Sequence, residues 1–113
     1  MILLYLISLM ILVHLIGSII SFLGKTFPKR VGNIIAIYEI VFYIIVVIFY
    51  PNMVTVLLAI GYLYLVIHVI GGILYIKGSL HKIYSNPNEL LYYGIYEFVE
   101  MIYLISLLIE LVV

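Results

Sequence analysis

The sequence predicts an all-α, polytopic membrane protein, a bundle of four transmembrane helices that run alternately up and down. Its composition is the first observation, since 68% of the 113 residues are hydrophobic and only 9% are charged. Ordinary soluble domains carry about 25% charged residues, so this chain has too few to face water on all sides. The other two observations are four long apolar stretches and prolines that fall only between them.

Each apolar stretch is long enough to cross a bilayer, because a helix needs about 20 apolar residues to span a hydrocarbon core of about 30 Å. Pro28, Pro51 and Pro87 each lie in a predicted connection. Proline interrupts a helix interior but is tolerated in loops. We therefore expect unbroken spans within one transmembrane domain that comprises residues 1–113. The predicted spans are about residues 2–23, 31–50, 53–76 and 90–113.

The basic residues predict how the bundle is oriented. All five lie in the first and third connections, and the middle connection has none. Cytoplasmic loops of membrane proteins are enriched in Lys and Arg, so we expect both basic connections to lie in the cytoplasm and both termini outside it. The residues of these cytoplasmic loops are Lys25, Lys29, Arg30, Lys77 and Lys82.

The two halves of the chain resemble each other, which indicates an internal duplication. Residues 13–17 (VHLIG) match residues 67–71 (IHVIG), and residues 37–41 (IYEIV) match residues 95–99 (IYEFV). A repeat that contains two spans keeps its direction in the membrane, so a pseudo-two-fold axis along the membrane normal should relate the halves. We expect two tandem helical hairpins, with repeat 1 at residues 1–50 and repeat 2 at residues 51–113.

Four ionisable residues of these repeats are predicted to lie at nearly one depth. With a rise of about 1.5 Å per residue, His14 and His68 lie about 15 Å from the cytoplasmic edge. Glu39 and Glu97 lie about 11 Å from the same edge, and Glu100 is one turn further out. Ionisable side chains inside a membrane are costly and usually functional. We therefore expect the four to face inward as a binding site.

A transition metal ion or a haem is the predicted ligand of this site. Two imidazoles and two carboxylates suit Zn²⁺, Fe²⁺ or Mn²⁺, and the carboxylates neutralise the charge of the ion. A haem b would instead lie between His14 and His68, whose imidazoles are suitable axial ligands. Either ligand would serve ion handling or redox chemistry in the membrane.

Two further interpretations stay open on the sequence alone. In the first, the chain is an accessory subunit of a larger membrane complex, and His14–Glu39 and His68–Glu97 hydrogen bonds fix the packing within each hairpin. In the second, the chain is a proton-coupled small transporter or ion pathway. The residues that would join the His/Glu quartet in such a proton path are Glu100, Tyr38, Tyr96 and Tyr43.

Composition also excludes several classes of function. The chain has no cysteine, which rules out disulfides, iron–sulfur clusters and thiolate ligands. Its net charge of zero offers no basic surface for nucleic acid. We find no catalytic motif, so the sequence identifies no reaction and favours a role other than catalysis by the chain alone. The expected partners are the lipid bilayer and either further copies of the chain or a larger membrane complex.

Overall fold

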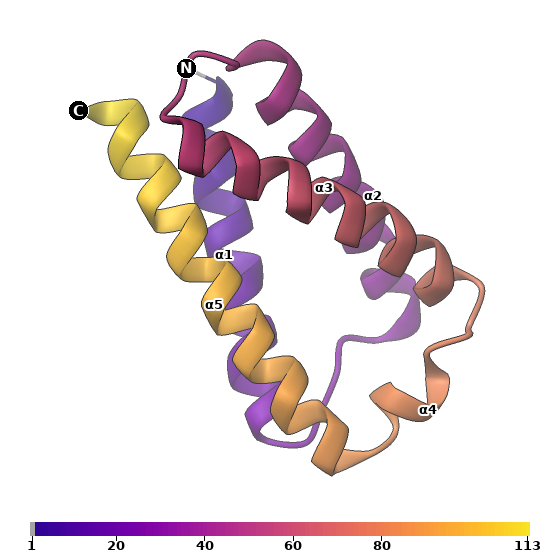
Figure 1. Ribbon diagram of the computed structural model, residues 1–113. Helices are drawn as coiled ribbons and strands as arrows, with labels where there is room; N and C mark the ends of the chain where they lie inside the picture. The colour runs from indigo at the N-terminus through magenta and orange to yellow at the C-terminus, as the bar shows by residue number, and fades with distance from the viewer. Residues whose placement is uncertain (1) are drawn as a thin grey trace. The chain divides into compact units, whose positions relative to one another are not determined.

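A computed structural model describes residues 2–113, and in this part of the chain the regular structure is entirely helical, with short connections between the helices and no strand. The prediction of an all-α fold is therefore confirmed. Four helices are long, and one short helix lies in the third connection (Figure 1). The helices are α1 (Ile2–Phe22), α2 (Lys29–Phe49), α3 (Thr55–Ile76), α4 (His81–Tyr84) and α5 (Pro87–Val112).

Three of the helices, α1, α2 and α3, are long and apolar enough to cross a membrane. The chain is thus compatible with a membrane protein. The fourth predicted span lies in α5, which has 26 residues and begins after Asn86, whose side chain accepts a hydrogen bond from the Asn88 N–H. Membrane crossing by α5, the duplication and the sides on which the termini lie stay predictions.

The described helices pack into two compact units. Unit 1 consists of the chain up to Phe27 together with Lys82–Val113, and unit 2 consists of Pro28–His81. In unit 1 α1 packs against α5, and in unit 2 α2 packs against α3. Each unit therefore combines one long helix from each predicted repeat.

The antiparallel helices of unit 1 approach each other closely at a glycine. Ser18 Oγ of α1 donates a hydrogen bond to the Gly94 carbonyl of α5, at 3.0 Å. A Cβ atom at Gly94 would lie 3.1 Å from the Phe22 ring and 3.3 Å from the Ser18 carbonyl oxygen. The small residue thus sets the spacing of the two helices. The buried apolar side chains of this unit include Leu3, Ile7, Met10, Leu90, Leu104 and Leu107.

Unit 2 is an antiparallel α2–α3 hairpin with an aromatic core. Phe42 and Tyr43 are fully buried, and their rings meet edge to face with centroids 5.1 Å apart. Gly72 of α3 lies against Ala36 and Ile40 of α2. Across the interface, the Tyr43 ring of α2 stacks on the Tyr64 ring of α3, with centroids 5.7 Å apart.

A glycine with positive φ ends both α1 and α3. Gly24 has φ 75° and Gly78 has φ 83°. In each case the N–H of the next residue bonds to the carbonyl five residues earlier, at 2.8 Å for Lys25 and 2.9 Å for Ser79. These are Schellman-type caps, which satisfy carbonyls that the helix leaves without partners. Gly24 lies ten residues after His14 and Gly78 lies ten residues after His68, so the two glycines hold corresponding positions in the predicted repeats. Their caps have the same hydrogen-bond pattern.

The change Gly24→Ala should lower the stability of the fold. A side chain in the left-handed conformation costs about 1–2 kcal/mol, so we expect a loss of about 1 kcal/mol in the free energy of unfolding, measured in detergent. Gly71→Ala is the matched control, because Gly71 has ordinary helical φ and a Cβ there meets nothing within 4 Å. Equal stability of the two variants would show that alanine at position 24 causes no backbone strain, and would contradict the prediction.

Candidate metal centre

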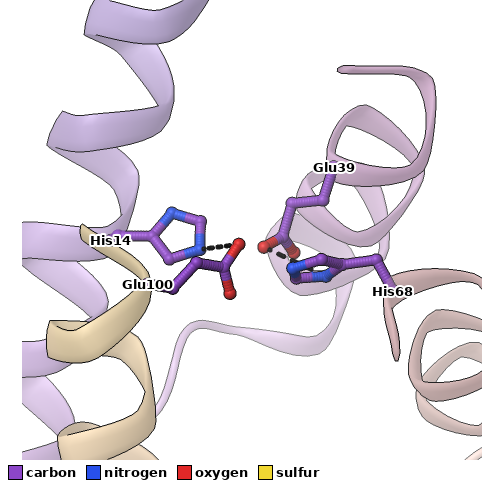
Figure 2. A group of neighbouring side chains, drawn as sticks. All are labelled: His14, Glu39, His68 and Glu100. Atoms are coloured by element: carbon purple, nitrogen blue, oxygen red, sulfur yellow. Dashed lines mark ion pairs between the residues drawn. The ribbon is translucent and has the colours of Figure 1, made fainter. Parts of the chain in front are cut away.

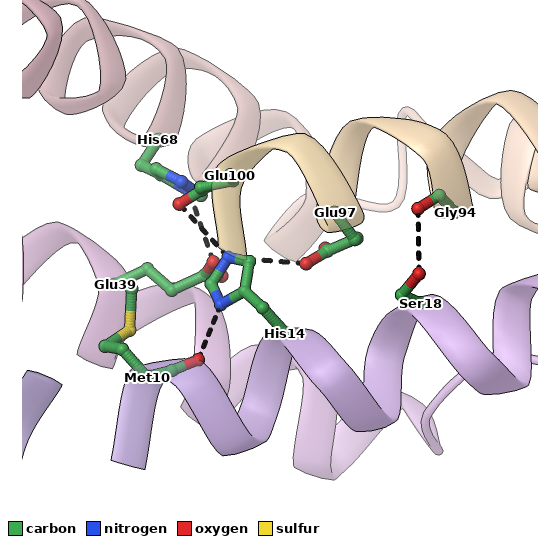
Figure 3. A network of polar contacts seen from close by, with 8 residues as sticks. All are labelled: Met10, His14, Ser18, Glu39, His68, Gly94, Glu97 and Glu100. Carbon is green, nitrogen blue, oxygen red and sulfur yellow. Dashed lines mark hydrogen bonds and ion pairs between the residues drawn. The ribbon is translucent and has the colours of Figure 1, made fainter. Parts of the chain in front are cut away.

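The His14 imidazole of α1 is held in one orientation by its own helix. Its Nδ1 lies 2.9 Å from the carbonyl oxygen of Met10, one turn earlier (Figure 3). A carbonyl only accepts hydrogen bonds, so Nδ1 carries the proton. In a neutral imidazole the lone pair is then on Nε2. Metal-binding histidines characteristically donate their second ring N–H to a carbonyl or carboxylate in this way.

Two carboxylates of α5 face this Nε2. It lies 3.0 Å from Glu100 Oε2 and 3.3 Å from Glu97 Oε2. The two glutamates are three residues apart and therefore share one face of the helix. His14 and Glu100 are both 0% exposed, so the group is buried. A lone pair next to two ionised carboxylates is repulsive, so the group needs a cation or a proton between its members.

The distances in this triad suit a metal ion. With metal–ligand bonds of about 2.1 Å, neighbouring donors are about 3.4 Å apart in a tetrahedron and about 3.0 Å apart in an octahedron, by simple geometry. The Nε2–oxygen separations of 3.0 and 3.3 Å fall in that range. Each carboxylate oxygen therefore lies at the distance from Nε2 that is expected of two neighbouring ligands of one ion.

Unit 2 contains its own His/Glu pair. His68 Nδ1 of α3 lies 3.5 Å from Glu39 Oε2 of α2. This exceeds the usual N–H···O range of about 2.7–3.2 Å and is close to the edge of a coordination tetrahedron. The Tyr43 ring stacks on the imidazole, with centroids 5.1 Å apart and planes at 13°, and Tyr64 stacks on Tyr43. Stacking fixes the plane of the His68 ring and excludes water from one of its faces.

These His and Glu side chains form groups that could hold a metal ion. His14, Glu39, His68 and Glu100 each offer a suitable ligand atom, and all except His68 are buried (Figure 2). Comparison with known protein families, curated proteins and solved structures finds no match. The chemistry of these groups is therefore the basis for inferring a function.

The pairing of the four predicted residues differs from the arrangement that the hydrogen-bonding interpretation assumed. That interpretation joined each histidine to the glutamate of its own hairpin. Within the units, the described ion pairs join His14 to Glu97 and Glu100, and His68 to Glu39. Each pair thus connects the two predicted repeats. Glu100, which the sequence placed one turn further out than Glu97, is the nearer of the two carboxylates to His14.

The three predicted tyrosines have different surroundings. Tyr43 stacks on His68, as described above. The Tyr38 ring lies 6.4 Å from Phe42, and the Tyr96 ring lies 6.3 Å from Tyr93, measured between centroids. Their part in a proton path stays a prediction.

Sequence reasoning missed the backbone carbonyl of Met10 as the group that orients His14. In an α-helix, the carbonyl of the residue four positions earlier lies close to the base of each side chain. The sequence therefore contains a signal only in the sense that His14 lies inside a helix, and the rotamer that uses this carbonyl was not predictable.

Proposed function

We propose that the protein binds a divalent transition metal ion in the membrane interior through His14, Glu97 and Glu100. The observation that carries the proposal is the His14 Nε2, which faces two buried carboxylates while Nδ1 is engaged with the Met10 carbonyl. The Nε2 lone pair and the two carboxylates repel one another. A cation between them would instead attract the nitrogen and both carboxylates. The purpose of binding would be ion handling or redox chemistry in the membrane.

The charges in the triad support a divalent ion. Two ionised carboxylates and one neutral imidazole carry a charge of −2, which a divalent ion neutralises. Neutrality matters because an isolated charge in a low-dielectric interior costs several kcal/mol or more. Mixed nitrogen and oxygen donors suit Zn²⁺, Fe²⁺ and Mn²⁺, whereas Cu(I) prefers sulfur. A haem is less well supported, because the Nε2 that would bind its iron is directed at carboxylates.

We further propose that His68 and Glu39 contribute ligands to the same ion. Support comes from the sequence, in which both repeats place a histidine and a glutamate at matching depths in predicted spans. The 3.5 Å separation of the His68 and Glu39 donors is also close to that expected around one ion. A site of this kind would draw on all four long helices, as carboxylate metal sites of helical bundles do.

Metal analysis of the purified protein tests the proposal. After loading with Zn²⁺, Fe²⁺ or Mn²⁺ and dialysis, we expect one equivalent of metal per chain and no Soret band. Glu100→Gln should weaken binding by about 100-fold, because loss of a residue that only orients a metal ligand already costs about 10–100-fold and this change removes a charged ligand. The control is Glu89→Gln, the same change at an exposed residue of the same helix, which should bind normally.

The variant His68→Ala separates the two parts of the proposal. Weaker binding with a stoichiometry of one ion would support a shared site. Unchanged binding would restrict the site to the triad of unit 1. A protein that takes up no metal, and in which Glu100→Gln changes only the thermal stability, would refute metal binding and favour the accessory-subunit interpretation.

A further inference from the structure

A cluster of positive charge lies at one end of unit 2. Lys29 and Arg30 form the start of α2, and Lys77 follows the last residue of α3. The two helix ends are joined by Lys29, whose Nζ lies 3.7 Å above the centre of the Tyr75 ring and donates to the Tyr75 carbonyl. We call Lys29, Arg30 and Lys77 the basic end of unit 2.

The Tyr75 ring is held at this end by a glycine. Its hydroxyl lies against Gly32 in the first turn of α2, and a Cβ at Gly32 would collide with the ring. The phenol therefore lies on α2 beneath the Lys29 ammonium. This contact orders one cation of the basic end and fixes the α3 terminus beside the α2 terminus.

No carboxylate of unit 2 lies near this charge. Glu39 is the only acidic residue between positions 28 and 81, and it pairs with His68. Ten residues separate it from Lys29, about 15 Å along the helix. In addition, cations in the first turn of a helix oppose the helix dipole, and α2 begins without a side-chain cap. The basic end thus concentrates three cations that no carboxylate of its own unit pairs with.

The basic end lies at the boundary of two candidate membrane spans. The span of α2 begins at Lys29, and the span of α3 ends at Ile76. If these helices cross the bilayer, the three cations are at the level of the lipid headgroups. Tyr75 suits this level, since tyrosine is enriched at membrane interfaces.

We propose that the basic end of unit 2 binds the phosphate headgroup of an anionic phospholipid. The Arg30 guanidinium can donate two parallel hydrogen bonds to a phosphate, and the Lys77 ammonium contributes a second cation from the adjacent helix. Lys29 adds its charge from its place above Tyr75. The proposal depends on unit 2 spanning a membrane and is independent of metal binding.

Lipid competition provides the test. The protein is exposed to equimolar phosphatidylglycerol and phosphatidylcholine, and the ratio of the two lipids retained is measured by native mass spectrometry. We expect phosphatidylglycerol to be preferred. The double variant Arg30→Gln/Lys77→Gln should reduce this preference about fivefold for each cation removed, and it leaves the Lys29–Tyr75 contact in place.

The matched control is Lys25→Gln/Lys82→Gln, which removes the same charge from unit 1. It should retain most of the preference, and both variants should keep the unfolding temperature of the parent in phosphatidylcholine. Equal losses in the two variants would show diffuse surface attraction and overturn the proposed site. Displacement of the bound lipid by millimolar inorganic phosphate would also overturn it, because the site would then recognise free phosphate.

Discussion

Replacing His14 with alanine is expected to remove most of the metal affinity. The side chain supplies the only nitrogen donor of the triad in unit 1, and its loss leaves two buried carboxylates beside a cavity. We expect the affinity for Zn²⁺ to fall by at least about 100-fold, because loss of a residue that only orients a metal ligand already costs about 10–100-fold. Isothermal titration calorimetry in detergent, with inductively coupled plasma analysis of the dialysed protein, measures the loss.

Two further variants make this result interpretable. His81→Ala removes an exposed imidazole of α4 and should bind metal like the parent protein. His14→Gln keeps a polar side chain of similar size in the buried position, so it separates loss of the ligand from loss of packing. If His14→Gln retained one equivalent of tightly bound metal, His14 would not be a ligand and the proposed triad would be wrong.

The proposed ion should also stabilise the fold. A ligand that binds only the folded state stabilises it by about 2.7 kcal/mol at a free concentration 100 times the dissociation constant. Removal of metal by a chelator should therefore lower the unfolding temperature of the parent protein. It should leave His14→Ala unaffected, which distinguishes a metal effect from a general effect of the chelator.

The helices and their polar residues were predictable from sequence because both depend on local information. Apolar stretches of sufficient length determine where helices form in lipid, and costly charges within them identify functional candidates. The short helix α4 was not predicted, because its four residues carry too weak a pattern. The start of the last helix was expected at residue 90 and lies at Pro87, where proline suits the first helical turn.

The partners of His14 could not be derived from the sequence. Helical spacing assigns a residue to a depth and a face, but it does not say which neighbouring helix that face meets. Two equal repeats make this ambiguity worse, since Glu39 and Glu97 occupy matching positions. In unit 1 the small volume of Gly94 determines which helix His14 meets. It allows α5 to approach α1, and this brings Glu97 and Glu100 to His14.

The change Gly94→Val should therefore damage both the fold and the metal site. The new Cβ would lie 3.3 Å from the Ser18 carbonyl oxygen, which is backbone and cannot turn aside, and 3.1 Å from the Phe22 ring. Overpacking of this kind costs about 1–3 kcal/mol, measured as a loss in the free energy of unfolding. We also expect weaker metal binding, because separation of α1 from α5 moves both carboxylates away from His14.

Gly17→Ala is the matched control for this prediction. Gly17 lies on α1 beside the same site, yet its Cβ would meet Phe27 at 3.5 Å and Glu97 at 3.7 Å, which are ordinary contacts. This variant should keep both the stability and the metal affinity of the parent. If Gly94→Val were as stable as Gly17→Ala and bound metal equally well, the close approach of α1 and α5 would not be what assembles the triad. In that case the positions of Glu97 and Glu100 would have to depend on other contacts of α5.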